Sequence, residues 1–337
     1  MNKRNIYNRQ IYMLFVCFLF QGIWTTQTWA KWTEIKPSNL GQFDPQEMPV
    51  VSWKNALWGV SRKSGVLMST DFATWSRQVS TLPMRDRWGH RLTTYEDKLI
   101  LTGDIWNYFN TDLFESDDGS NWFRIGYLFS PSLAYHTSLT FNDKLWLIGG
   151  YEFRYCDEID GAEDESLYGN ISVEDKYEGE WGCCEGIRII DSIFYTDNGS
   201  NWYSRDAPGP GRASHTSVLF DNKMWVFGGL SGGCLGDSGL NGVLLNDVWS
   251  SVDGVTWGPV IDAASWSPRS GHQTVVFRDK IWLLGGYTEE GHTNDVWYST
   301  NGVDWVMEEN EAPWSPRSGH VCVVHNNILV LIGGFVT

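Results

Sequence analysis

Short hydrophobic runs separated by tight polar turns recur along most of this chain. One copy reads Val275-Val276-Phe277, then Arg278-Asp279-Lys280, then Ile281-Trp282-Leu283-Leu284. Two short apolar runs joined by a polar turn are typical of a β-hairpin. Runs without polar alternation favour strands that are buried on both faces. The pattern therefore predicts many short, buried, antiparallel strands.

A fixed spacing marks these hairpins as copies of one unit. Five segments carry a His followed thirteen residues later by a Gly, and in four of them an Arg stands three residues before the His. The five segments are His90 to Gly103, His136 to Gly149, His215 to Gly228, His272 to Gly285 and His320 to Gly333, and the four arginines are Arg87, Arg212, Arg269 and Arg317. Repetition at a constant spacing is the sequence signature of a repeat architecture.

A second hairpin follows the glycines. Asn294-Asp295-Val296-Trp297 leads to the turn Asn301-Gly302 and then to Trp305, and three other segments have the same plan. Asn-Gly and Asp-Gly favour hairpin turns because both residues tolerate positive φ. Each unit therefore has four antiparallel strands, which is the composition of a propeller blade.

The Arg-x-x-His, Gly-Gly, Asn-Asp-Val-Trp and final Trp elements together resemble the kelch repeat, over nearly all of residues 31–337. The resemblance implies an all-β propeller of four-stranded antiparallel blades. The turns Asp117-x-Gly119-x-x-Trp122 and Asp197-x-Gly199-x-x-Trp202 also resemble the Asp-box of sialidase-like propellers.

The Trp that ends each unit predicts six blades. It occurs at Trp32, Trp75, Trp122, Trp202, Trp257 and Trp305. The last unit has only its two inner strands, so we expect Lys31-Trp32-Thr33 to supply a fourth strand and the closing blade to contain both termini. Closure of this kind protects sheet edges. The sequence does not identify the third strand of that blade.

Residues 1–30 resemble a secretory signal. Lys3, Arg4 and Arg9 precede the apolar run 11–20, and Ala30 follows Thr28-Trp29. This tripartite pattern predicts cleavage after Ala30, and the run is too short to span a bilayer. The domain prediction is thus a signal peptide at 1–30 and a propeller at 31–337, located in a secreted, periplasmic or extracellular compartment.

The charge of the chain limits its partners. The net charge is −16, and cleavage after Ala30 would make it −19 because it removes three bases and no acid. So acidic a surface repels phosphate backbones, which argues against a nucleic-acid partner. No membrane insertion is expected after signal cleavage.

Two long connections between second and third strands are candidate functional loops. In a four-stranded blade the 2–3 and 4–1 connections share one face, and the other turns share the opposite face. Insertions at 151–190 and 230–245 therefore lie on the same face of adjacent blades. Long loops on a rigid scaffold commonly carry function.

The first insertion is strongly acidic, with twelve acids against three bases. Acids mixed with aromatics suit a basic protein surface, a cationic ligand or Ca²⁺, whereas a solvated loop without a ligand is the alternative. No cofactor is predicted otherwise. The candidate residues in this acidic loop are Asp157, Asp160, Glu163, Asp164, Glu165 and Trp181.

Four cysteines lie in the two insertions, and an oxidising compartment would favour disulfides. The candidates are Cys156, Cys183, Cys184 and Cys234. We expect one bridge within the first loop and one to the second, and a vicinal Cys183–Cys184 bond is the alternative. Cys322, in an innermost strand, is expected to be a buried thiol. The spacing predicts no metal site, since no Cys-x-x-Cys pair occurs.

The repeated Arg and His residues ring the expected channel mouth, where kelch propellers commonly hold ligands. Because they recur in nearly every blade, we expect them to fix the 4–1 loops by hydrogen bonds. Departures from the repeat are of more interest for binding, notably Trp88 and Tyr135. The candidates on this face are Arg87, Trp88, His90, Tyr135, His136, Arg212, His215, Arg269, His272, Arg317 and His320.

Three functions remain open. The favoured one is a secreted binding propeller that recognises a protein or a carbohydrate through the face bearing the 2–3 and 4–1 loops. The second is a carbohydrate-active enzyme resembling the sialic-acid mutarotases or, less well, the copper-radical sugar oxidases of kelch propellers. The third is a purely structural surface protein with N-glycosylation acceptors at Asn170 and Asn198.

Overall fold

The computed structural model describes most of the chain. The described residues are 14–21, 28–35, 48–62, 65–79, 87, 89–103, 112–127, 133–154, 186–207, 209–232, 235–236, 239–240 and 242–336. Within these ranges every regular element is a β-strand. None of the described residues forms a helix of the length and hydropathy that crossing a membrane requires.

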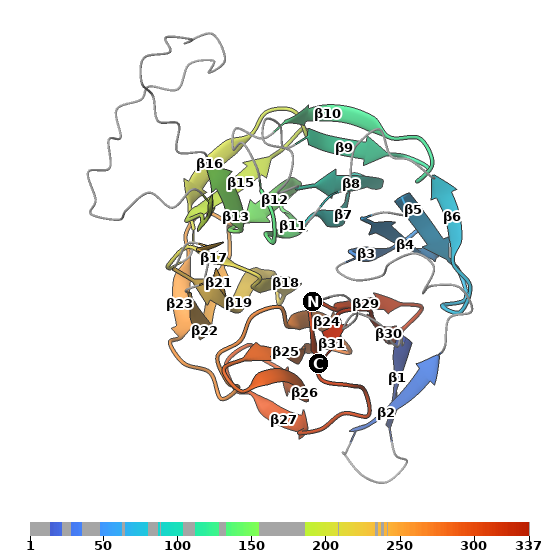
Figure 1. The fold of residues 1–337 in the computed structure, drawn as a ribbon, viewed down its shortest axis with the longest axis vertical. Coiled ribbons are helices and arrows are strands. Elements are labelled where there is room, and N and C mark those ends of the chain that lie inside the picture. The colour runs from blue at the N-terminus through green and yellow to red at the C-terminus, as the bar shows by residue number, and fades with distance from the viewer. Residues whose placement is uncertain are drawn as a thin grey trace, which may run out of the picture.

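The strands form sheets arranged around a central axis, as Figure 1 shows. This confirms the predicted all-β propeller with antiparallel blades. The predicted count of six four-stranded blades is wrong. Among the described residues five sheets have four strands, and the sheet around β19 (Lys223–Ser231) has five. The fifth strand arises because β19 extends past its blade, where β17 (Arg212–Ala213) pairs with it.

Blades 1 to 5 are formed by consecutive chain segments. Blade 1 contains β3 (Val50–Trp53), β4 (Ala56–Ser61), β5 (Gly65–Ser69) and β6 (Ser76–Val79), and blade 2 contains β7 (Arg91–Tyr95), β8 (Lys98–Thr102), β9 (Asp112–Ser116) and β10 (Phe123–Tyr127). Blade 3 contains β11 (Thr137–Phe141), β12 (Lys144–Ile148), β15 (Ser192–Thr196) and β16 (Tyr203–Asp206). Blade 4 contains β17, β18 (Thr216–Phe220), β19, β22 (Val243–Ser251) and β23 (Gly258–Ile261), and blade 5 contains β24 (Gln273–Phe277), β25 (Lys280–Thr288), β26 (Gly291–Ser299) and β27 (Val306–Glu309).

The remaining four-stranded sheet, the closing sheet, joins both ends of the chain. Its inner strands are β29 (Val321–His325) and β30 (Ile328–Ile332), and its outer strands are β1 (Leu14–Gln21) and β2 (Thr28–Ile35). Figure 1 shows β1 and β2 beside β30. β2 contains the expected fourth strand. The third strand, which the sequence left unassigned, is β1, and its residues overlap the apolar run of the predicted secretory signal.

Three two-stranded sheets stand outside the blades. They pair β13 (Tyr151–Arg154) with β14 (Gly186–Ile189), β20 (Leu235–Gly236) with β21 (Gly239–Leu240), and β28 (Arg317–Ser318) with β31 (Phe335–Val336). The first two pairs belong to the predicted insertions at 151–190 and 230–245. β14 and β20 are in contact, so the two insertions lie side by side, as expected from their positions in adjacent blades.

The outer turns explain the repeated Asp-Gly and Asn-Gly pairs. The Asp253 carboxylate accepts hydrogen bonds from the backbone N–H groups of Val255 and Thr256, and Asn301 makes the equivalent pair. In the turn predicted to resemble an Asp-box the acceptor is Asp118, directly before Gly119, rather than Asp117. The turns are thus Asx-turns, in which a short polar side chain replaces a backbone acceptor.

The apolar core lies mainly between neighbouring blades. Strand-two residues such as Leu57, Leu147, Leu283 and Leu331 are fully buried, which agrees with the prediction that unbroken apolar runs are covered on both faces. The turn glycine of one blade packs on the strand-two Trp of the preceding blade, as Gly302 does on Trp225. Neighbouring blades therefore interlock through these turns.

Candidate functional site

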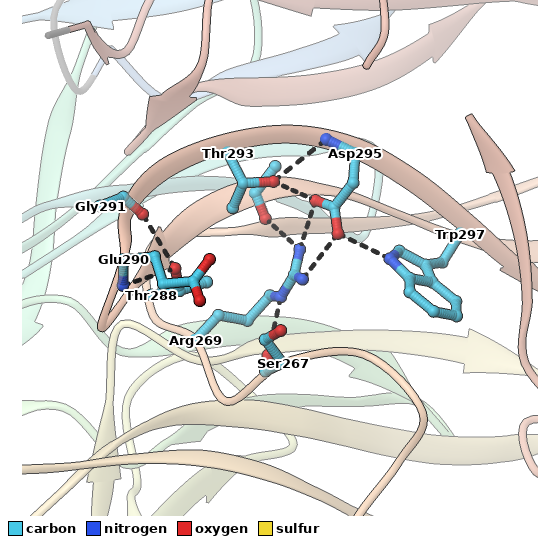
Figure 2. Close-up of polar contacts among 9 residues, drawn as sticks. Ser267, Arg269, Thr288, Glu290, Gly291, Thr293, Asp295 and Trp297 are labelled. Carbon is cyan, nitrogen blue, oxygen red and sulfur yellow. Dashed lines mark hydrogen bonds and ion pairs between the residues drawn. The ribbon is translucent and has the colours of Figure 1, made fainter. Parts of the chain in front are cut away.

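Each repeat arginine fastens its own 4–1 loop. Arg269 lies in the turn before β24, and its Nη1 donates to the Gly285 carbonyl at 2.9 Å. Its two terminal nitrogens also pair with both oxygens of Asp295, at 2.7 and 2.8 Å. Figure 2 shows the guanidinium between Asp295 and the Ser267 carbonyl, which accepts from Nε at 3.0 Å. A bidentate pair of this kind fixes orientation as well as charge.

The other three arginines make the same first contact. Arg87, Arg212 and Arg317 donate to the carbonyls of Gly103, Gly228 and Gly333, at 2.7, 3.0 and 2.6 Å. Arg212 also has a bidentate partner, Asp247. All four guanidinium groups belong to buried residues. These contacts match the predicted role of the arginines in holding loops, and they leave the guanidinium groups embedded in the protein.

The repeat histidines lie in the seams between blades. His136 Nε2 lies 2.8 Å from Thr102 Oγ1 of the preceding blade, and His90 Nε2 lies 2.9 Å from the Val60 carbonyl oxygen. His215 and His272 contact Thr137 and Thr216 in the same way, each at 3.1 Å. All five histidines are buried.

Burial also fixes the charge state of these rings. It lowers the pKa of His90 to about 4 and the pKa of His272 and His320 to about 3. Burial also holds the pKa of His136 and His215 well below its usual range. Because desolvation disfavours the charged ring, all five imidazoles are neutral near pH 7. They contact the preceding blade as neutral rings and bring no positive charge to the mouth.

A chain of backbone hydrogen bonds encircles much of the channel mouth. In four of the five repeats the residue directly before the His donates its N–H to the carbonyl of the equivalent residue in the preceding blade, with distances of 2.7 to 3.0 Å, and Gly89 acts as the first acceptor. The five residues in this chain are Gly89, Tyr135, Ser214, Gly271 and Gly319. All five have φ between +51° and +65°. The bonds tie consecutive 4–1 loops together into one rim.

Tyr135 and Ser214 depart from the glycine that the rim otherwise uses. A residue with a Cβ costs roughly 1–2 kcal/mol in this left-handed conformation. The Tyr135 ring lies against Gly89, where an added Cβ would be 2.6 Å from it, and meets the Tyr151 ring edge-on at 5.6 Å between centroids. Strain of this kind persists where the surroundings compensate for it, and it is often found at binding sites.

A cavity of about 290 Å³ lies at the mouth and between the inner strands. Its described lining is rich in hydroxyl groups, with one cation, Arg91, and no carboxylate. The hydroxyl-bearing residues in the lining are Tyr135, Thr137, Ser138, Ser214, Thr216, Ser217, Ser270, Thr274 and Ser318. The cavity is therefore polar and, Arg91 aside, uncharged.

Two of these hydroxyls are unsatisfied within the described residues. Ser217 Oγ and Thr274 Oγ1 are buried, and neither has a hydrogen-bond partner within the described part of the protein. Buried hydroxyls normally have a partner, so the two atoms mark places where a ligand group would be favoured. Gln273, whose amide both donates and accepts, lies beside them in the lining.

The residues predicted for this face coincide with the cavity lining only in part. Tyr135 and three of the histidines, His215, His272 and His320, border the cavity. The prediction did not include Arg91, Ser217, Gln273 and Thr274, which stand one or two residues after a repeat His. That offset is the signal that would have found them, since the inner strand begins there and faces the channel.

Several predicted residues lie outside the described ranges. These are Trp88, the acidic-loop residues Asp157, Asp160, Glu163, Asp164, Glu165 and Trp181, and the disulfide candidates Cys156, Cys183, Cys184 and Cys234. Cys322 is half-buried, lines the cavity and forms no disulfide. The described residues contain no group of three or more His, Cys, Asp or Glu side chains placed to hold a metal ion.

Comparison with known proteins agrees with this architecture. Residues 189–335 match the sequence model of the KLHDC2/KLHL20/DRC7 Kelch-repeats domain. That stretch runs from the end of β14 through blades 4 and 5 to β31.

The fold is also similar to a solved structure titled "Structure of YjhT". The TM-score is 0.64 at 15% sequence identity, and the match covers 87% of this chain and 91% of the other. At so low an identity the likeness concerns the fold.

Proposed function

We propose that this β-propeller, whose residues 189–335 match a kelch-repeats sequence model, is a recognition module that binds a carbohydrate at the mouth of its central channel. The ligand would enter on the face that carries the 2–3 and 4–1 loops. The observation that supports the proposal is the cavity of about 290 Å³ lined by hydroxyl groups, an amide and the Tyr135 ring.

The chemistry of the lining suits a polyhydroxylated ligand. Each Ser or Thr hydroxyl can donate one hydrogen bond and accept two, which complements the hydroxyl groups of a sugar. Tyr135 adds an aromatic ring at the rim, where one face of a pyranose would stack. Small-molecule sites typically combine such a ring with a few placed polar groups.

The lining favours binding over catalysis. Acid–base chemistry on a sugar needs a positioned acid and base with pKa values near the working pH. Among the described lining residues there is no Asp or Glu, and the bordering histidines have pKa values far below neutrality. The carbohydrate-active alternative therefore has less support than the binding function.

A glycan array with the purified chain tests the proposal, and Tyr135→Gly is the informative variant. Gly stands at the equivalent position in three other loops, so the rim keeps its backbone conformation while the aromatic ring is removed. We expect at least a tenfold loss of affinity, about 1.4 kcal/mol, for any glycan that the wild type binds. Thr274→Val, which removes one cavity hydroxyl, should weaken binding by about tenfold as well.

Phe123→Ala is the matched control, because Phe123 is an exposed aromatic on β10, at the outer edge of blade 2. Its affinity should equal that of the wild type. If both Tyr135→Gly and Thr274→Val bind the glycan as tightly as the wild type, the glycan binds outside the cavity. Anomerisation of the bound sugar, or release of hydrogen peroxide from it, would replace the binding function with the enzymatic one.

The cellular location belongs to the same proposal. A secretory signal at residues 1–30 would place the protein outside the cytosol, so its carbohydrate ligand would be found there as well. Binding of a basic partner or of Ca²⁺ by the acidic loop at 151–190 also stays a prediction. Intact-mass measurement of protein recovered from outside the cells, with a start at Lys31, would support export.

A further inference from the structure

The polar side chains of the inner strands line only one side of the channel cavity. In blades 3, 4 and 5 both residues that follow the repeat His are polar, and all of them line the cavity. They are Thr137, Ser138, Thr216, Ser217, Gln273 and Thr274. Because the inner strands β11, β18 and β24 contact one another in turn, these side chains form one continuous surface, the polar wall.

The hydroxyls of the polar wall divide into two kinds. The Oγ1 atoms of Thr137 and Thr216 lie 3.1 Å from the Nε2 atoms of His215 and His272, so these hydroxyls serve the seams between blades. Ser217 Oγ and Thr274 Oγ1, one residue further along each strand, are buried without a partner in the described part of the protein. Buried hydroxyls favour a partner, so the polar part of a ligand would lie beside these two atoms.

The closing sheet and blade 1 bring apolar side chains to the same cavity. Their inner strands, β29 and β3, are in contact and lie side by side in Figure 1. The polar residues that the closing sheet adds to the described lining are Ser318, which lies beside Gly271 of blade 5, and the buried His320. The remaining residues of this side, the apolar wall, are Pro49, Val50, Val321, Cys322 and Phe335.

The apolar wall has a structural cause. A repeat His that enters a seam finds a hydroxyl on the preceding inner strand, as His272 finds Thr216. No His precedes His90 in the sequence, so blade 1 has no repeat His to place in the seam with the closing sheet. Val321 packs there against the buried Met48 and Val50. The weak first blade therefore makes the cavity lining apolar on one side.

We propose that the carbohydrate taken up by this cavity is a glycoside with a short apolar aglycone. The inference rests on the proposed carbohydrate binding and adds the class of ligand. The sugar hydroxyls would bond to Ser217 and Thr274, and the aglycone would lie against Val50 and Val321. A free sugar would instead turn hydroxyl groups toward the apolar wall, where burial without a partner is costly.

The test measures affinities of glycoside pairs for the unmodified full chain by isothermal titration calorimetry. The panel contains the methyl and n-butyl glycosides, as both anomers, of glucose, galactose, mannose and N-acetylglucosamine. We expect an n-butyl glycoside to bind about tenfold or more tightly than its methyl counterpart, because its extra methylenes leave water. The matched methoxyethyl glycoside has an ether oxygen in the same chain and should lose most of that gain.

Two variants locate the two parts of the ligand. Val321→Thr replaces one methyl group of the apolar wall by a hydroxyl and should weaken n-butyl binding about fivefold, while methyl binding changes by less than about twofold. Thr274→Val, in the polar wall, should weaken both members of a pair alike. If Val321→Thr does not fold, the comparison of methyl, n-butyl and methoxyethyl glycosides on the unmodified chain still decides the question.

The outcomes separate this inference from the proposed function. Equal affinity within every methyl and n-butyl pair, with both weakened by Thr274→Val, would overturn the apolar aglycone and leave carbohydrate binding intact. Tighter n-butyl binding that neither variant changes would place the alkyl chain outside the cavity and overturn it too. If the panel does not bind but the glycan array gives a ligand, the aglycone alone fails. If neither experiment gives a ligand, the proposed function fails.

Discussion

At the scale of single residues, the repeat is explained by buried polar groups that satisfy one another. The side chain of Arg269 is 1% exposed and that of its partner Asp295 13% exposed. Burying either charge without the other would therefore cost a large desolvation free energy. Burial raises the pKa of Asp295, but bonds from Arg269, Thr293 and Trp297 outweigh it and leave the pKa below the usual value. A lone buried guanidinium would be strongly destabilising.

The first prediction concerns this pair. Asp295→Asn should lower the free energy of unfolding by about 3 kcal/mol, because it leaves the Arg269 cation buried without its countercharge. Chemical denaturation measures the difference. Asp262→Asn, an exposed acid on the surface of the same region, is the control and should change stability by less than about 0.5 kcal/mol. Equal stability of the two variants would contradict the role assigned to the pair.

At the scale of strands and turns, the blades interlock through small residues. Gly302 lies in the 3–4 turn of blade 5 with φ of +76°, and a Cβ there would collide with the buried Trp225 ring. Gly119 and Gly254 meet Trp58 and Trp146 in the same way. The Asp-Gly and Asn-Gly pairs therefore serve two purposes, since glycine allows the turn and admits the neighbouring Trp.

The corresponding prediction is that Gly302→Ala costs about 2–4 kcal/mol, because it adds backbone strain to a steric clash with Trp225. Gly258→Ala is the control. Gly258 lies at the start of β23, and an added Cβ there meets no atom within 4 Å. The denaturation midpoint of the control should match the wild type, and a Gly302→Ala protein as stable as the control would refute the packing argument.

At the scale of the whole molecule, neutral histidines link five consecutive seams. The pKa of each ring lies below its value of about 6.5 in an unfolded chain, so below that pH the unfolded state binds more protons than the folded state. Stability is then complete above pH 6.5 and decreases as the pH falls. Glu308 and Glu309, whose pKa values burial raises, oppose this trend near pH 5.

We therefore expect the free energy of unfolding to fall between pH 7 and pH 5, at a rate approaching roughly 1.4 kcal/mol per pH unit for each buried His. Urea denaturation at pH 7.5, 6.5 and 5.5 measures it. In His272→Gln the slope should be shallower by about one histidine's share, even if the variant is less stable overall. A pH-independent stability would show that the rings are charged when folded.

The sequence predicted the blade architecture because its signals are local. The His-to-Gly spacing, the turn dipeptides and the fourth-strand Trp each report on residues that are neighbours within one hairpin or one blade. Arg269 and His272 could be assigned structural roles for the same reason, since their recurrence implied a task shared by all blades. The extra strand β17 was missed because it depends on how far β19 extends beyond its blade.

What the sequence by itself determined is the propeller, its repeat and the loops that border the mouth. Only the tertiary structure decided which side chains share the cavity, that Tyr135 and Ser214 complete a hydrogen-bonded rim, and that β1 fills the third position of the closing sheet. The physical reason is that a hairpin forms from adjacent residues, whereas the channel exists only once blades far apart in sequence close into a ring.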